Sequence, residues 1–141
     1  MSVTIKHNKN ARTTDAFAII AEAWNELVQD GLTPDYVSVP PIFDESEVLY
    51  AISEDGDIVG VLVWHHEASA AAYVITLAYV EPSSRQQGVF TAMFAELKKR
   101  ACAVGAKFIR STVTAAQVSQ FDVFARVGCR KAAITYEQRV S

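Results

Sequence analysis

One stretch, from Tyr79 to Leu97, limits the fold most, because it has the pattern of a buried strand, a short polar loop and an amphipathic helix. The strand is apolar from Ala72 to Val80 and stops at Glu81-Pro82. After the loop, apolar residues recur at the one-face spacing of a helix, at Val89, Phe90, Met93, Phe94 and Leu97. The first N–H groups of a helix have no partner within it, and the helix dipole adds positive potential there. The stretch is therefore predicted to form a cradle for a phosphate or another anion.

The loop of this stretch carries Arg85, Gln86, Gln87 and Gly88. A glycine lets the backbone approach an anion with no Cβ in the way. A strand, loop and helix also occur in any α/β domain, so an ordinary turn in an unrelated fold is the alternative interpretation.

The remaining chain predicts a definite order of elements from apolar periodicity, turn residues and helix-closing glycines. The expected strands are Val3–Ile5, Val48–Ser53, Ile58–Trp64, Ala72–Val80, Lys107–Val113 and Cys129–Val140. The expected helices are Thr14–Asp30, with Phe17, Ile20, Ala21, Trp24, Leu27 and Val28 inward, Gln87–Val104 and Gln117–Val127. A proline-rich loop, Leu32–Glu47, follows the first helix.

This order predicts one α/β (α+β) domain over residues 1–141, a length that suits a single core. Short connections make the middle strands antiparallel, whereas the Gln87–Val104 helix makes a parallel crossover. We expect a mixed, mostly antiparallel central sheet of six to seven strands, flanked by helices on both faces.

Composition excludes several classes of protein. The formal net charge is −3, and no lysine-arginine run marks a surface for nucleic acid or an anionic membrane. No apolar run approaches the roughly 20 residues of a membrane span, and no signal pattern opens the chain. Cys102 and Cys129 lack the spacing of metal ligands, so no metal is expected. They are interpreted as two buried, reduced thiols in a cytoplasmic protein, with a disulfide between them as the alternative.

The loop and its flanks resemble a known family signature. Val80-Glu81-Pro82 followed by Arg85-Gln86-Gln87-Gly88-Val89 is similar to the motif of the GNAT superfamily of N-acetyltransferases, R/Q-x-x-G-x-G/A after a strand ending in V-x-P. The predicted element order is also similar to that family's over essentially the whole chain. One residue departs from the motif: Phe90 stands where the family has a second glycine or alanine.

The resemblance implies that acetyl-coenzyme A is the cosubstrate. Its pyrophosphate would lie on the loop amides, and its pantetheine arm would pair with the strand end as another strand does. The implied cofactor-binding residues are Tyr79, Val80, Arg85, Gln86, Gln87, Gly88, Val89, Phe90, Thr91, Gln117 and Phe124. For Arg85 and Thr91, an exposed side chain without this role is the alternative.

The catalytic groups follow the family pattern less closely. Many members donate a proton to the leaving thiolate from a tyrosine four residues before the glycine that closes the last helix, and this chain has Phe124 there. Gln117 stands where an asparagine is usual. A phenylalanine cannot donate a proton. The candidate catalytic residues are His65 or His66 as the base and Tyr73 as a donor. The alternatives are exposed histidines at a hairpin end and a tyrosine of the core or rim.

Together these features predict an acetyl-coenzyme A-dependent N-acetyltransferase acting on a primary amine of a small molecule or a protein. The Leu32–Glu47 loop, made acidic by Asp35, Asp44, Glu45 and Glu47, would shape the acceptor pocket; a solvated charge cluster is the alternative. The last strand is a candidate edge for pairing between two copies in a homodimer. The alternative function, which Phe90 and Phe124 favour, is a non-catalytic GNAT-like module that binds coenzyme A or a partner protein.

Overall fold

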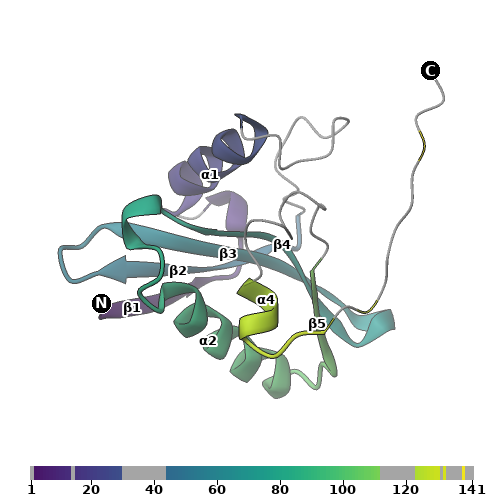
Figure 1. Ribbon diagram of the computed structural model, residues 1–141. Helices are drawn as coiled ribbons and strands as arrows, with labels where there is room; N and C mark the ends of the chain where they lie inside the picture. Colours follow the sequence, from purple (N-terminus) through teal and green to yellow (C-terminus); the bar gives the residue numbers. More distant parts are fainter. Residues whose placement is uncertain are drawn as a thin grey trace.

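The protein's structure, a computed structural model, describes residues 2–13, 15–29, 44–111, 123–130, 132 and 138. Within these residues five strands form one sheet, in the spatial order β1-β2-β3-β4-β5. The strands are β1 (Val3–Asn8), β2 (Glu47–Ser53), β3 (Ile58–Glu67), β4 (Ala72–Val80) and β5 (Phe108–Ser111). The helices are α1 (Phe17–Gln29), α2 (Val89–Ala103) and α4 (Val123–Arg126). Figure 1 shows α1 on one side of the sheet and α2 with α4 on the other.

The pairing of the strands confirms the predicted mixed sheet. β1, β2, β3 and β4 pair antiparallel in turn, and β5 returns parallel to β4 through the α2 crossover. The expected six to seven strands exceed the five that the described residues form. Most of the strand expected over Cys129–Val140 falls outside them, and its four described residues, Cys129, Arg130, Ala132 and Gln138, belong to no strand.

Each face of the sheet carries its own hydrophobic core. The α1-side core joins α1 to the sheet through Ile20, Trp24, Val48, Tyr50, Val61, Val63, Leu77 and Tyr79. The α2-side core joins α2 to the sheet through Leu49, Leu62, Trp64, Tyr73, Ile75, Val89, Met93 and Leu97. β4 contributes to both cores, which explains its continuous apolar sequence.

The buried face of α1 is rotated from the predicted one. Its buried residues are Ile19, Ile20, Ala23 and Trp24. Phe17 and Val28, which were expected to point inward, are 47% and 46% exposed. The short apolar residues Ala16 and Ala23 are fully buried, so α1 lies close to the sheet. None of the described helices is long and apolar enough to cross a membrane.

The cysteines correct one expectation. Cys102 is exposed and Cys129 is partly buried, and both are free thiols. The interpretation as two buried thiols was therefore wrong, and the two residues form no disulfide.

Candidate active site

A β-bulge interrupts β4 at Thr76. Val63 of β3 is opposite Leu77 and Trp64 is opposite Ile75, so Thr76 is an extra residue with no opposite partner. The bulge reverses the side-chain alternation: Tyr73 and Ile75 belong to the α2-side core, but Leu77 belongs to the α1-side core. Bulges bend a strand and end its regular pairing, and they are frequent beside active sites.

The bulge coincides with the end of the described pairing between β4 and β5. That parallel register extends from Ala72 opposite Phe108 to Ile75 opposite Ser111. The four residues that follow Thr76, up to Val80, extend about 13 Å at the usual rise of a strand. Along this segment β4 pairs with β3 on one side only within the described part of the chain.

Backbone geometry identifies the groups on the other edge of this segment. The Glu81 N–H donates to the Val59 carbonyl at 2.9 Å. Because hydrogen-bonded and non-hydrogen-bonded pairs alternate along antiparallel strands, the backbone groups of Tyr79 point to Val61 of β3. Those of Ala78 and Val80 point to the opposite edge, which pairs with no strand of the described residues and which we call the open edge of β4. Of the two residues predicted to offer backbone groups to a cofactor, Val80 faces this edge and Tyr79 faces β3; Ala78 is the other residue of the segment that faces this edge.

The predicted anion cradle has a suitable backbone in the structure. After a short turn over Pro82–Ser84, Gln86 has φ +62° and Gly88 has φ +83°, and α2 begins at Val89. Alternating turn conformations of this kind let successive N–H groups converge on an anion. No side chain caps the N-terminus of α2 within the described residues. The first helical turn thus presents its donors to whatever lies in front of the loop.

Gly88 leaves room for a ligand at this cradle. A Cβ built on Gly88 would meet no atom within 4 Å. Its positive φ is one that residues with a side chain rarely adopt, so glycine is favoured in the turn itself.

The side chains of the loop divide into exposed and anchored ones. Gln86, Gln87 and Thr91 are exposed, whereas Val89 is buried against β3. The Gln87 side chain donates to the Ser83 carbonyl at 3.1 Å and holds the loop. The loop thus presents its backbone amides together with the exposed side chains of Gln86 and Thr91.

Arg85 is turned back toward β4. Its Nε donates to the Val80 carbonyl at 2.8 Å, and its Nη2 donates to Oε1 of Glu26 at 2.9 Å. Its guanidinium lies over the ring of Tyr79, with Cζ 5.5 Å from the ring centroid. The hydroxyl of Tyr79 donates to the other oxygen of Glu26. This three-residue network joins α1, β4 and the loop.

The network also shifts the pKa values of Glu26 and Tyr79. Burial opposes ionisation of Glu26, but the hydrogen bonds from Tyr79 and Arg85 and the charge of Arg85 outweigh it, so the pKa of Glu26 is lowered. Burial, followed by the hydrogen bond to Glu26, raises the pKa of Tyr79 well above its usual range. Tyr79 is thus a poor proton donor to a reacting group.

The two residues that depart from the family pattern contact each other. The rings of Phe90 in α2 and Phe124 in α4 meet edge to face, with centroids 5.5 Å apart. Phe90 also stacks on Phe94 at 6.0 Å. Both Phe90 and Phe124 pack against the α2-side core, so the large side chain at position 90 is accommodated inward. Gln117 lies outside the described residues.

The three candidate catalytic residues lie on two different faces. Strand alternation places His65 on the side of Val63, in the direction of α1, and His66 on the side of Trp64. His66 meets the ring of Tyr73 edge to face at 5.3 Å, and Tyr73 is buried beside Trp64. Burial, followed by the charge of Glu47, raises the pKa of Tyr73. The structure therefore brings His66 and Tyr73 together, and His65 apart from them.

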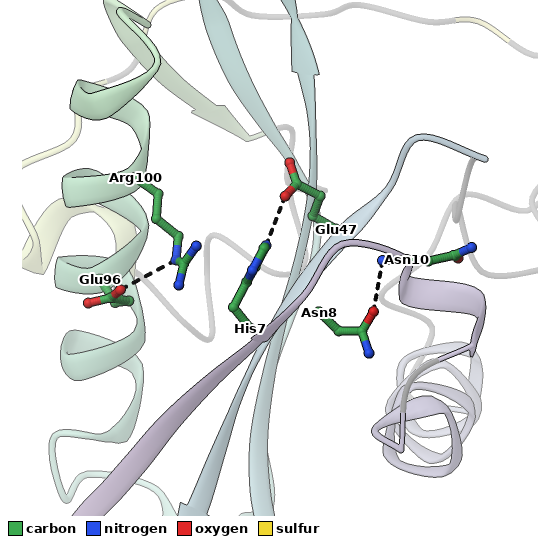
Figure 2. A network of polar contacts seen from close by, with 6 residues as sticks. All are labelled: His7, Asn8, Asn10, Glu47, Glu96 and Arg100. Atoms are coloured by element: carbon green, nitrogen blue, oxygen red, sulfur yellow. Dashed lines mark hydrogen bonds and ion pairs between the residues drawn. The ribbon is translucent and has the colours of Figure 1, made fainter.

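Polar side chains gather around the end of the sheet where Tyr73 lies. Figure 2 shows His7 of β1 pointing to Glu47 of β2, with Nε2 and Oε1 2.8 Å apart. It also shows Arg100 of α2 beside Glu96, at 3.3 Å. Glu47, expected at the end of the acidic loop, is in β2 and pairs with His7.

The loop predicted over Leu32–Glu47 is described only from Asp44 on. Asp44 forms an exposed ion pair with Arg12 at 2.9 Å. Asp35 lies outside the described residues. At least one of the carboxylates expected in this loop, that of Asp44, is therefore paired with a nearby arginine.

Sequence reasoning missed three residues of this site: Thr76, Ala78 and Glu26. Thr76 was the single residue that is neither aliphatic nor aromatic within the run Ala72–Val80, which was the available signal for an irregularity in β4. Glu26 interrupts the apolar periodicity of α1 next to Leu27, but such a position is usually solvated.

Comparisons with known proteins agree with this geometry. Residues 13–129 match the model of the Acetyltransferase (GNAT) family. No curated protein matches the chain.

Solved structures with similar folds include acetyltransferases of several kinds. The aminoglycoside acetyltransferase meta-AAC0020 from an uncultured soil metagenomic sample, in complex with trehalose, has a TM-score of 0.71 at 11% identity, over 99% of this chain and 97% of its own. The ribosomal-protein-alanine N-acetyltransferase of Brucella melitensis biovar Abortus 2308 has a TM-score of 0.67 at 17% identity, over 98% and 99%.

A third similar structure was solved with a cofactor. N-acetylglutamate synthase from Neisseria gonorrhoeae, complexed with coenzyme A and N-acetyl-glutamate, has a TM-score of 0.67 at 17% identity, over 94% of this chain and 30% of its own. At these identities the likeness concerns the fold. The family model, which covers most of the chain including β4, the cradle and α2, shows that this protein belongs to the GNAT family of acetyltransferases.

Proposed function

We propose that the protein transfers the acetyl group of acetyl-coenzyme A to a primary amine of a small molecule or a protein. The observation that carries the proposal is the continuity of two binding surfaces. The open edge of β4, from the bulge at Thr76 to Val80, leads directly into the cradle at Gly88 and the start of α2. An extended chain ending in a pyrophosphate matches that shape: a strand-like partner followed by an anion.

The residues present suit acetyl-coenzyme A. The amides from Gln86 to Thr91 would hold the pyrophosphate, and the backbone of Ala78 and the N–H of Val80 would pair with the pantetheine arm. The cosubstrate supplies an acetyl group activated as a thioester. An N–H of the open edge near the bulge would donate a hydrogen bond to the carbonyl oxygen, where negative charge develops.

Between the two candidate bases, His65 and His66, we favour His65. It lies in β3 opposite Val74, two residues before the bulge, and on the α1 side of the sheet. The Leu32–Glu47 loop that we expect to shape the acceptor pocket follows α1 in the chain. Imidazole is the most frequent general base, and a base must lie within reach of the amine or of one bridging water. His66 and Tyr73 occupy the opposite face, so we assign them structural roles.

The apolar pair of Phe90 and Phe124 lies where a proton donor was sought. Phe124 carries no exchangeable proton, so the leaving thiolate would take its proton from water or from the ammonium formed on the acceptor. A thiolate leaves readily compared with an alkoxide, because a thiol is far more acidic than an alcohol. The missing donor therefore does not prevent transfer.

Titration calorimetry with acetyl-coenzyme A tests cofactor binding. The proposal predicts saturable binding with one site per chain, and no detectable heat at millimolar ligand would overturn it. A panel of amines then tests turnover, with release of the free thiol as the signal. The panel should contain polyamines, an aminoglycoside and peptides with a free α-amino group, because similar structures include enzymes named for small-molecule and protein acceptors.

The second candidate is a module that binds coenzyme A or a partner protein without catalysis. The contact between Phe90 and Phe124 favours it, because this contact fills the position of the usual proton donor with an aromatic pair. Binding of acetyl-coenzyme A without thiol release for any amine would favour the module. Thiol release that depends on an amine would exclude it.

A further inference from the structure

Arg85 is a cation in the cradle loop, but its guanidinium engages the strand and α1. Its Nε bonds to the Val80 carbonyl and its Nη2 bonds to Glu26, at 2.8 and 2.9 Å. Both side chains are about two-thirds buried, with 32% of Arg85 and 29% of Glu26 exposed. An ion pair with bonds of this length and burial is better held than an exposed one.

The acceptor that Arg85 occupies is on the open edge of β4. The carbonyl of Val80 points away from β3, since Glu81 and Tyr79 on either side are the residues that pair with Val59 and Val61. A neighbouring strand or an extended ligand would pair at this edge. The Val80 carbonyl is the last backbone acceptor of β4 on this edge. Arg85 occupies that carbonyl and fixes its orientation.

Glu26 sets the position of Arg85 through both of its carboxylate oxygens. One oxygen accepts from Arg85, and the other accepts from the hydroxyl of Tyr79 in β4 itself. The guanidinium is thus held between a helix on one face and the strand end, over the Tyr79 ring. The ion pair with Glu26 thus holds the guanidinium in place, and the loss of Glu26 is expected to release Arg85 from Val80.

We propose that Glu26 and Arg85 are positioning residues that set the open edge of β4 for the extended, uncharged arm of the cofactor, and that Arg85 is not a ligand of its pyrophosphate. The inference rests on the proposed function. Arg85 would then shape the edge of β4 and not recognise phosphate. Through Glu26, α1 would also contribute to cofactor affinity.

Two ligands separate these roles: acetyl-coenzyme A and S-acetylpantetheine, which carries the same arm and thioester without any phosphate. Affinity for each is measured by titration with the full chain, for the wild type and for Arg85→Gln, Arg85→Lys and Glu26→Gln. The control is Lys98→Gln, which removes one exposed positive charge from α2 outside the loop. Circular dichroism at each temperature used verifies that every variant is folded.

The positioning role predicts that Arg85→Gln weakens both ligands by the same factor, about tenfold, the effect of losing one charged hydrogen bond. Glu26→Gln should do the same, and the double variant should lose no more than either single one. Arg85→Lys, which keeps the charge but not the fork, should resemble Arg85→Gln. Lys98→Gln should change neither affinity by more than about twofold.

A phosphate role gives the opposite pattern. If Arg85→Gln weakened acetyl-coenzyme A alone, or if Arg85→Lys bound it as the wild type does, the inference would be overturned while the proposed function stood. Additive effects of the Glu26 and Arg85 variants would also overturn it. Failure of the wild type to bind acetyl-coenzyme A would overturn the proposed function itself.

Discussion

Gly88→Ala adds one methyl group to the cradle, and it tests whether cofactor affinity is lost by more than the change in stability explains. Its φ of +83° lies in the left-handed region, where a Cβ costs about 1–2 kcal/mol. A Cβ there would meet no atom within 4 Å, so no steric clash adds to that cost. Gly88→Ala is therefore expected to lower the free energy of unfolding by about 1–2 kcal/mol, which lowers the Tm by roughly 3–8 °C in a domain of this size.

Binding should suffer more than stability. The added methyl group would lie in the loop whose backbone an anion approaches, before the first turn of α2. We expect acetyl-coenzyme A affinity to fall at least about tenfold, or about 1.4 kcal/mol, when measured by titration calorimetry at a temperature where the variant is fully folded.

Gly105→Ala is the matched control for this experiment. Gly105 follows α2 at its other end, has φ +78°, and would also place a Cβ within 4 Å of no atom. The two variants should lose similar stability in thermal unfolding, and Gly88→Ala alone should lose affinity. Equal loss of affinity in both variants, or none in either, would refute the cradle.

Three further predictions concern stability and turnover. Glu26 has a lowered pKa in the fold, so the stability it contributes is fully present above its ordinary value of 4.5 and is lost as pH falls through the folded value. Glu26→Gln should flatten the acid side of a series of urea unfolding curves, and an unchanged pH profile would contradict this. Gly60→Ala should cost about 1–3 kcal/mol in urea unfolding, because its Cβ would lie 3.0 Å from the side chain of Met93. Unaltered stability would contradict this and show that the Met93 side chain moves aside without a measurable cost. His65→Ala should lower amine-dependent thiol release by roughly 10²–10⁴-fold at unchanged cofactor affinity, whereas His66→Ala should have little effect. Equal losses in the two variants would remove the distinction between the faces.

Local patterns in the sequence predicted the central elements well. The strand expected over Ala72–Val80 has those bounds in the structure, and the following helix begins and ends within two residues of its prediction. Both follow from short-range signals, an apolar run and a helical periodicity closed by Gly105. The first helix begins three residues later than expected, at Phe17, because Asp15 and Ala16 form a turn.

Features that depend on contacts between distant elements could not be predicted in this way. The bulge at Thr76 is hidden because β4 is apolar toward both faces, so a reversal of alternation leaves no trace in the pattern. The link from Glu26 to Arg85 joins residues 59 positions apart. Nothing in the local sequence of either residue specifies the other, and only the packing of α1 on β4 brings them together.

The structure explains the two residues that depart from the family pattern. Phe90 and Phe124, which were separate anomalies in the sequence, form one edge-to-face aromatic contact between α2 and α4. Such a pair is favourable by about 0.5–1.5 kcal/mol beyond its burial. The large side chain beside the cradle is thus part of the α2-side core.

The central claim is that the open edge of β4 and the cradle at Gly88 hold one continuous cofactor. A crystal structure of the protein with acetyl-coenzyme A tests it most directly. We expect the pyrophosphate within hydrogen-bonding distance of amides between Gln86 and Thr91, and the pantetheine arm paired with the backbone of Ala78 and the N–H of Val80. A cofactor bound elsewhere, or a pyrophosphate held by the Arg85 side chain with Glu26 released, would contradict it.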